Sequence, residues 1–359
     1  MKTKVIIAVS ILIIGMGCIS KRNSSQCSIH RSNIDISHEL FTHLLSDENY
    51  HYLFGVVEGN QLDYRISEIT IERSTVGDEK IWNSFSEKIP GKCWAVCQTI
   101  QNIFLISEQH ELKDGNPEFS KHKLYRISKE SSQIEELYEW NQGNSFIRDV
   151  YFDSDEIGYV FFRPSGNPLD YQFLKTNNGG KEWNAVELNR PVNVVHRKDE
   201  RLYFLSYKNN LRSDWIYSIN KNNDNLDSIQ FNLNITDFSV EENGDYWLLG
   251  KEEDRTVLQR YEKERTTGVH AFSDDADVIP KQLYKYNELI VVIASQIDKN
   301  MLGGFGGTKP LMFVSKDNGL TWDNHRLDEA LYLKPISFYK DEQMTAYVGN
   351  GKVLTCKFQ

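Results

Sequence analysis

The chain has 359 residues, with 51 acidic against 41 basic residues and a formal net charge of −10 at pH 7. This acidity, without a basic stripe interleaved with aromatic residues, argues against a nucleic-acid partner. The 40% of apolar residues and 12% of aromatic residues supply a core for one large all-β domain or for two ordinary domains.

Residues 1–17 have the composition of an export signal. Two lysines precede an apolar run of about a dozen residues, which is too short to span a bilayer because a span takes about 20. The run ends in a glycine followed by Cys18, which resembles a bacterial lipobox, so Cys18 is predicted to become the lipidated N-terminus. Small residues at Gly15 and Gly17 also suit ordinary signal cleavage. Either route exports the chain, and residues 18–28 are predicted to be a polar tether.

Export permits disulfides among the four cysteines that follow Cys18. If Cys93 and Cys97 share an extended strand, they lie about 13 Å apart. Their Cα atoms are then beyond the limit of about 7 Å for a bridge, so they face the same side without pairing. Neither the cysteine spacing nor any His/Cys cluster indicates zinc, and we predict no metal and no cofactor.

A repeated unit fills residues 29–359: an apolar strand, a polar turn and a second apolar strand. Consecutive copies begin roughly 45 to 55 residues apart, close to the period of β-propeller blades. Third and fourth strands follow most copies, which predicts a single all-β, seven-bladed propeller of four-stranded blades. Six blades remain the structural alternative, because the start of the first copy also fits a short helix. The seven copies span residues 40–57, 94–106, 150–162, 192–205, 238–249, 283–293 and 336–348.

Two predicted turns between third and fourth strands share a pattern of short polar residues, glycine and tryptophan. The polar side chains can bond to their own turn, the glycine permits a positive φ, and the tryptophan returns to the core. The pattern resembles the Asp box, or BNR repeat, of sialidase-like β-propellers, where it stabilises turns. The first copy comprises Thr176, Asn178, Gly180 and Trp183, and the second comprises Ser315, Asp317, Gly319, Thr321 and Trp322.

The seventh copy lacks a fourth strand before the chain ends. The alternating segment Ile29 to Ile36 is predicted to supply that strand and to close the ring, which would hide two sheet edges. Closure would bring Cys27 near Cys356, so these two cysteines are predicted to form a latch disulfide.

Candidate chemistry was weighed on the longer loops after each second strand, where binding residues tend to gather. Phe162-Arg163-Pro164 only partly matches a sialidase arginine motif, and residues 303–309 lack the order and the helix of a phosphate-binding loop. The acidic run 274–277 does not have calcium-loop spacing. The histidines are scattered among different copies, and no Ser-His-Asp arrangement stands out.

In its blade count the chain looks like the photosystem II assembly-factor propellers, which are exported, often lipidated and non-enzymatic. This resemblance implies a cell-envelope lipoprotein whose propeller face binds a protein or glycan, with membrane contact only through the N-terminal lipid. The alternative is a glycoside hydrolase of sialidase-like type. A sialidase needs three convergent arginines, and other glycosidases need two carboxyl groups about 5–10 Å apart.

Overall fold

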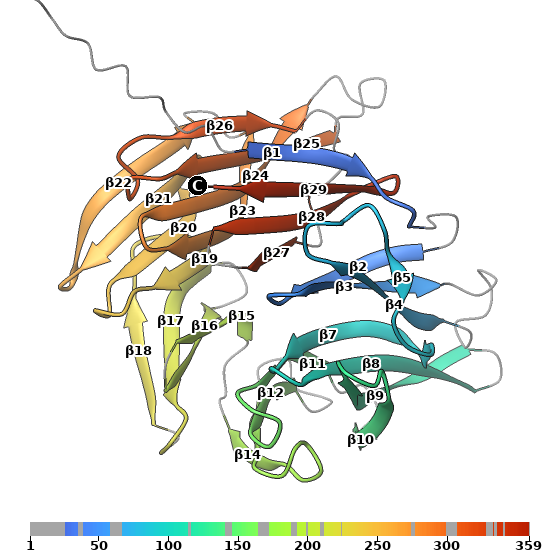
Figure 1. Cartoon of the computed structure of the whole chain (residues 1–359). Coiled ribbons are helices and arrows are strands. Elements are labelled where there is room, and N and C mark those ends of the chain that lie inside the picture. Colours follow the sequence, from blue (N-terminus) through green and yellow to red (C-terminus); the bar gives the residue numbers. More distant parts are fainter. Residues whose placement is uncertain are drawn as a thin grey trace, which may run out of the picture.

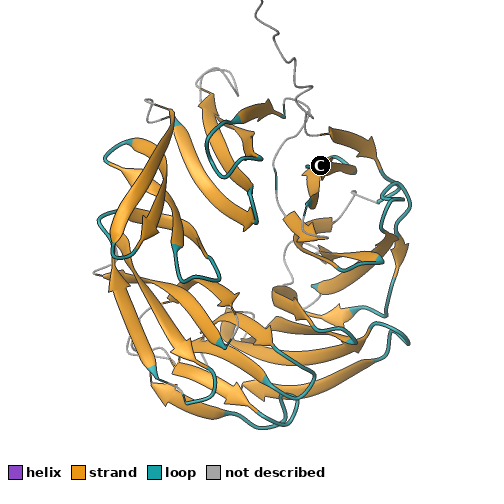
Figure 2. Ribbon diagram, turned by 60° about the vertical axis from the view of Figure 1, so that its left-hand side comes forward, coloured by secondary structure: helices purple, strands orange, loops and turns teal. Residues whose placement is uncertain are grey.

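Seven antiparallel sheets surround a common centre in the computed structural model of the chain (Figures 1 and 2). The model describes residues 26–34, 39–57, 67–113, 116–140, 146–163, 172–187, 192–198, 200–208, 212–223, 225–273, 277–298, 307–327, 333, 336–339 and 342–358. These residues contain strands and turns and no helix, so none of them forms a helix that could cross a membrane. Residues 1–17 and Cys18 lie outside the described ranges.

Each sheet is one blade, and its strands follow the chain from the centre of the ring outward. Blade 1 contains β2 (Glu39–Ser46), β3 (Tyr50–Val57), β4 (Glu68–Thr75) and β5 (Asn83–Ser84), with β6 (Ile89–Pro90) also paired to β4; blade 2 contains β7 (Lys92–Gln98), β8 (Asn102–Lys113), β9 (Asn116–Ser128) and β10 (Ile134–Trp140); blade 3 contains β11 (Phe146–Phe152), β12 (Gly158–Arg163), β13 (Gln172–Thr176) and β14 (Asn184–Glu187); blade 4 contains β15 (Val192–Lys198), β16 (Arg201–Lys208), β17 (Arg212–Asn220) and β18 (Leu226–Gln230).

The remaining blades complete the ring, and in blade 7 the outermost strand is the N-terminal β1. Blade 5 contains β19 (Asn234–Val240), β20 (Tyr246–Glu252), β21 (Arg255–Glu262) and β22 (Arg265–Ser273); blade 6 contains β23 (Val278–Tyr286), β24 (Leu289–Asp298), β25 (Gly307–Ser315) and β26 (Asp323–Arg326); blade 7 contains β27 (Ile336–Tyr339), β28 (Gln343–Gly349), β29 (Lys352–Lys357) and β1 (Gln26–Arg31). The seven-bladed prediction is confirmed. The six-bladed alternative and the helical start of the first copy are wrong, because Leu40 and its neighbours form β2.

The hydrophobic core is divided into seven clusters, and each cluster lies between two consecutive blades. Side chains on successive strand positions point to opposite faces of a sheet. In β16, Leu202 and Phe204 therefore pack against blade 3, whereas the next residue, Leu205, packs against blade 5. The seventh cluster joins Phe41 and Leu53 of blade 1 to Tyr347 of blade 7, so the ring is closed.

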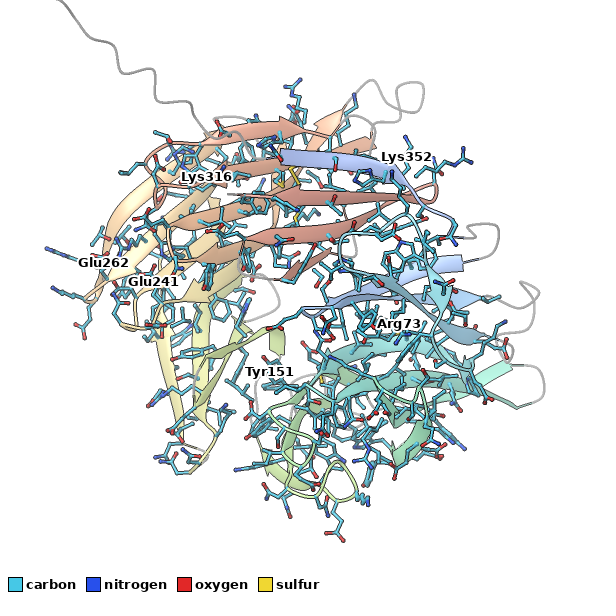
Figure 3. All side chains as sticks on the ribbon, viewed as in Figure 1. Arg73, Tyr151, Glu241, Glu262, Lys316 and Lys352 are labelled. Carbon is cyan, nitrogen blue, oxygen red and sulfur yellow. A yellow bond between two sulfur atoms is a disulfide. The ribbon has the colours of Figure 1, made fainter. Side chains whose placement is uncertain are left out.

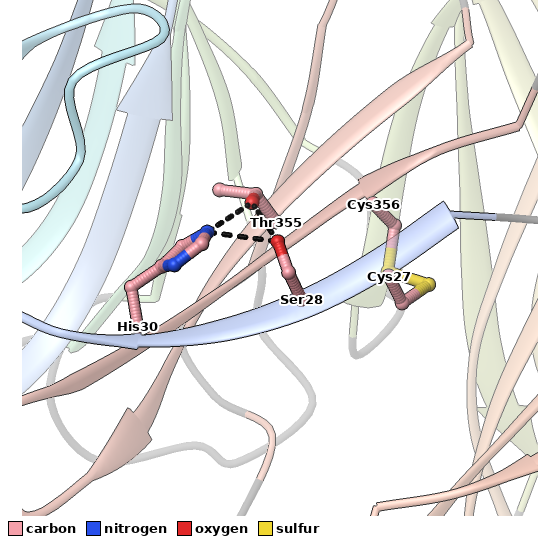
Figure 4. Close-up of a disulfide and its surroundings, with 5 residues drawn as sticks. All are labelled: Cys27, Ser28, His30, Thr355 and Cys356. Atoms are coloured by element: carbon pink, nitrogen blue, oxygen red, sulfur yellow. Dashed lines mark hydrogen bonds between the residues drawn. A yellow bond between two sulfur atoms is a disulfide. The ribbon is translucent and has the colours of Figure 1, made fainter.

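The two ends of the chain meet in blade 7. Strand β1 pairs antiparallel with β29 from Gln26 opposite Lys357 to Arg31 opposite Lys352, and a disulfide joins Cys27 to Cys356 (Figure 4). On the other face of β1, Ser28, His30 and Thr355 exchange hydrogen bonds between 2.8 and 3.3 Å long. An N-terminal strand thus completes the last blade.

The innermost strands carry a β-bulge in six of the seven blades. In β7 the bulge lies between Cys93 and Ala95, and it shifts the alternation of side chains by one position. Cys93 therefore packs between blades 1 and 2, while Cys97 packs between blades 2 and 3. The expectation that these two cysteines face the same side is wrong, although both are free thiols.

Candidate binding site

The turn between β25 and β26 is held by its own side chains. The backbone N–H of Gly319 donates to Ser315 Oγ over 2.8 Å, and Ser315 Oγ donates to Asp317 Oδ1 over 2.8 Å. Asp317 accepts from the backbone N–H of Thr321 at 2.8 Å and from its hydroxyl at 2.6 Å. Trp322 Nε1 donates to the carbonyl of Gly319 at 3.1 Å. Gly319 has φ 87°, which favours glycine.

The turn between β13 and β14 repeats this arrangement with different chemistry. Thr176 Oγ1 accepts from the backbone N–H of Gly180 at 3.0 Å, and Trp183 Nε1 donates to the carbonyl of Gly180 at 3.0 Å. Asn178 Oδ1 accepts from the backbone N–H of Glu182 at 2.9 Å, and Asn178 Nδ2 donates to Glu182 Oε2 at 3.3 Å. An amide suits this position because a carboxylate there would face Glu182.

A turn in blade 1 shares the tryptophan bond of this arrangement and was not predicted from the sequence. Trp82 Nε1 donates to the carbonyl of Glu79 at 2.8 Å, three residues upstream as in the other two turns. Ser74 Oγ donates to the carbonyl of Asp78 at 2.8 Å, and Glu79 Oε1 accepts from the N–H of Gly77 at 2.8 Å. Serine and tryptophan stand eight positions apart here instead of seven, so the spacing concealed this turn.

These turns also fasten the outer half of a blade to its inner hairpin. The backbone N–H of Asn318 donates to the carbonyl of Glu288 at 2.9 Å, and that of Gly179 donates to the carbonyl of Glu156 at 2.8 Å. Val76 makes the equivalent bond in blade 1. The polar residues of the turns thus bond mainly within the turns and to the neighbouring hairpin, which is a structural role.

A cavity with a partly apolar rim lies between blade 5 and the turn of blade 6. It has a volume of about 400 Å³, and the indoles of Trp247 and Trp322 line it. Two of the exposed large apolar side chains among the described residues also line it: Leu320 is 84% exposed and Val269 is 55% exposed. Apolar groups this exposed around a hollow are typical of a recognition surface. We call this cavity the 5/6 pocket.

One side of the 5/6 pocket carries a charged network. Arg260 Nη2 lies 2.6 Å from Glu262, 3.4 Å from Glu241 and 3.6 Å from Asp245, while its Nε has no hydrogen-bond partner. Lys285 Nζ lies 3.2 Å from Glu241. Glu241 and Glu262 lie on the same margin of the ring (Figure 3).

Glu241 of this network is ionised near neutral pH. Burial alone would raise the pKa of Glu241, but the indole N–H of Trp247 and the ammonium of Lys285 outweigh burial and hold that pKa below its usual value. Burial lowers the pKa of Lys285 from 10.5. Burial also lowers the pKa of His270, which stacks on Trp322 with ring centroids 4.9 Å apart. His270 is therefore neutral at pH 7.

Two larger cavities are more polar. The first, of about 1000 Å³, lies between blades 1 and 2 and is lined by serine hydroxyls with Glu87, Arg126 and Glu135. The second, of about 760 Å³, lies between blades 4 and 5 and is lined by charged residues including Arg255. Each of the three cavities is lined by a single arginine, whereas a sialic-acid carboxylate site needs three.

A hydrogen-bonded line of serine, histidine and glutamate was also not anticipated. His51 Nδ1 lies 2.8 Å from Ser46 Oγ, and His51 Nε2 lies 3.3 Å from Glu79 Oε1. His51 is fully buried and packs edge-on against Tyr339 of blade 7, with ring centroids 4.7 Å apart. The 5/6 pocket and the two larger cavities do not include this line. It fastens blade 1 to blade 7 where the ring closes.

Part of the loops favoured by the sequence lies outside the described residues, including residues 164–171 and 299–306 and the acidic positions 274 and 275, whereas residues 108–113 and 116–121 belong to β8 and β9. Among the described residues, no three His, Cys, Asp or Glu side chains are grouped so that they could hold a metal ion. The described histidines make packing or polar contacts: His196 Nε2, for example, lies 2.8 Å from Asp237 of the next blade.

The fold and the site define a seven-bladed β-propeller with a pocket between two blades. No protein-family model matches the sequence, and no curated protein matches it. YCF48 bound to a D1 peptide has a similar structure, with TM-score 0.62, 10% identity, and coverage of 93% of this chain and 97% of that chain. The β-propeller domain of Cps50 (Swd1) from Myceliophteria thermophila is also similar, with TM-score 0.57, 8% identity, and coverage of 92% of this chain and 100% of that chain. The β-propeller domain of the Pyrococcus furiosus trilobed protease, which has an open velcro topology, has TM-score 0.55 and 10% identity. The match covers 86% of this chain and 91% of that chain.

Proposed function

We propose that this protein is an exported cell-envelope lipoprotein, anchored by a lipid on Cys18, whose propeller binds a protein or glycan partner without catalysing a reaction. The N-terminal signal pattern supports export, and the net charge of −10 disfavours a nucleic acid. The two turns predicted from the sequence are then Asp boxes with a structural role, because their polar groups bond mainly within their own turns.

One observation carries the binding proposal: the 5/6 pocket joins exposed Val269 and Leu320 to an indole-lined hollow. Aromatic side chains such as these two indoles are enriched at the centres of protein interfaces. One similar structure supports a binding role for such a fold, since YCF48 is bound to a D1 peptide.

A glycosidase is the weaker candidate. Arg255 is paired with Glu252 at 3.0 Å, and the sialidase geometry of three arginines around one carboxylate does not occur in the three cavities. Ser46, His51 and Glu79 are buried, so a substrate cannot reach the hydroxyl.

The binding proposal is tested by affinity capture from an envelope extract of the producing cell. The wild-type propeller should retain a partner that Leu320→Arg loses, because a charge replaces an apolar contact at the pocket. Ile100→Arg is the matched control, since Ile100 is 95% exposed and does not line the pocket. Equal retention by Leu320→Arg, or turnover of envelope glycans by the wild type, would contradict the proposal.

Anchoring is tested separately by metabolic labelling with a radioactive fatty acid. The wild type should incorporate the label and Cys18→Ser should not. Label in both proteins, or in neither, would contradict lipidation at Cys18.

A further inference from the structure

Strand β22 is an unusually open sheet edge. It is the outermost strand of blade 5, and no described residue pairs with its outer side. Its nine residues make it the longest outer strand, and residues 266–272 carry no charged group. Thr266, Val269 and Ala271 are exposed.

The other outer strands are protected in the ways that natural proteins use to prevent edge pairing, namely shortness and charge. Strands β5, β14 and β26 have two, four and four residues. Strands β10 and β18 contain acidic residues, and β1 ends in an arginine. Strand β22 also begins with an arginine and has β-bulges at Thr267 and Phe272, but it alone among the seven combines nine residues with an uncharged run longer than five positions.

The 5/6 pocket lies beside this edge because residue 268 has no side chain. Gly268 lines the pocket together with Thr267, Val269 and His270 of the same strand. A Cβ atom built on Gly268 would meet only Arg260 Cβ, at 4.0 Å, so the space beside it is open. A strand added along β22 could therefore place one of its own side chains in the pocket.

The aromatic rings of the pocket favour a peptide over a sugar. Sugars bind by stacking on free ring faces, but Trp247 is already within 5.4 Å of the Arg260 guanidinium and 5.7 Å of the Lys285 ammonium. Trp322 is stacked by His270 and contacted edge-on by Phe272 at 4.9 Å. What remains open is the β22 backbone and a hollow of side-chain size.

The charge distribution disfavours a second copy of this chain and an acidic peptide. Two copies would each bring a net charge of −10. At the pocket, three carboxylates surround two cations: Glu241, Asp245 and Glu262 against Arg260 and Lys285. A neutral or basic segment fits this surface better.

We propose that β22 binds an extended, non-acidic peptide segment of a partner protein as a fifth strand of blade 5, with one aliphatic or aromatic side chain of that segment in the 5/6 pocket. Backbone hydrogen bonds would supply affinity and the pocket would supply selectivity, as in other β-strand additions. This inference rests on the proposed function and names the partner's chemistry.

The test uses a fluorescent peptide, acetyl-Lys-Thr-Val-Tyr-Val-Thr-Lys-amide, titrated with the full exported chain while anisotropy is measured. Two further peptides replace the central tyrosine by glycine, to empty the pocket, or both valines by proline, to prevent pairing. Val269→Lys/Ala271→Lys blocks the edge, and Leu226→Lys/Ser228→Lys places the same charges on β18 as the matched control. Gly268→Val fills the pocket without backbone strain.

We expect the edge-blocking variant and the proline peptide to weaken binding at least about tenfold, and the β18 control to leave it unchanged. Gly268→Val should bind the tyrosine and glycine peptides with equal affinity. If this variant fails to fold, the difference in affinity of the wild type for these two peptides still tests the pocket. The inference would be overturned if the peptide bound equally to all variants, or if it did not bind the wild type at about 1 mM. It would also be overturned if sedimentation showed that the wild type is a dimer and the edge-blocking variant a monomer. If the edge-blocking variant still captures the partner, the inference is wrong and the binding function stands.

Discussion

Breaking the Cys27–Cys356 disulfide should destabilise the ring more than most single contacts do. The bond links residues 329 positions apart, so it closes nearly the whole described chain into a loop. The chain-entropy relation gives about 6 kcal/mol for a loop of this length at 25 °C. The six residue pairs of β1 and β29 stay in place without it, so Cys27→Ser/Cys356→Ser should fold and lose about 4–6 kcal/mol of unfolding free energy.

This loss corresponds to a fall of about 6–9 °C in Tm, because a chain of this size gains about 0.7 kcal/mol/K of entropy on unfolding. Calorimetry of the oxidised wild type and the double variant measures it. A reductant should lower the Tm of the wild type to that of the variant and leave the variant unchanged. Melting of both proteins within about 1 °C of each other would refute the reasoning.

Three other predictions concern turns and a buried histidine. Ser315→Ala should lower the unfolding free energy by about 1–3 kcal/mol in urea titration, because it leaves the Gly319 N–H without its acceptor; no change would contradict that role. Asn178→Asp should destabilise by about 0.5–1 kcal/mol through repulsion by Glu182, and adding Glu182→Thr should restore stability; an equally unstable double variant would disprove the pairing. His122 is 1% exposed, neither of its ring nitrogens has a hydrogen-bond partner, and burial lowers its pKa to about 4. The folded state then binds fewer protons than the unfolded state, so stability should fall as pH drops from 6.5 towards 4, by up to about 3 kcal/mol. His122→Phe should remove this part of the pH dependence, and an unchanged profile would show that His122 is not its source.

The sequence was sufficient to predict the blades because each blade repeats a local pattern. Apolar strands of period two and polar turns such as residues 241–245 are visible without knowing any long-range contact. Closure was also predictable, since a seventh copy that lacks a strand leaves an edge which only the N-terminal segment near Ile29 can cover.

What could not be predicted depends on contacts between blades or on one-residue irregularities. The bulge at Cys93 reverses the side-chain alternation that the spacing implies, and one additional residue before Trp82 concealed the turn in blade 1. The 5/6 pocket joins Trp247 to Trp322 across two blades, and no sequence pattern indicates which side chains meet there. His51 likewise meets Tyr339 only because the ring closes.

Hydrogen–deuterium exchange along the full chain, with and without the captured partner, tests the central claim most directly. We expect the partner to slow amide exchange in residues 265–273 and 318–322, because a strand added to β22 would cover both the edge and the turn of the 5/6 pocket. Protection confined to the opposite rim, such as residues 252–255, with exchange in β22 unchanged, would contradict the account.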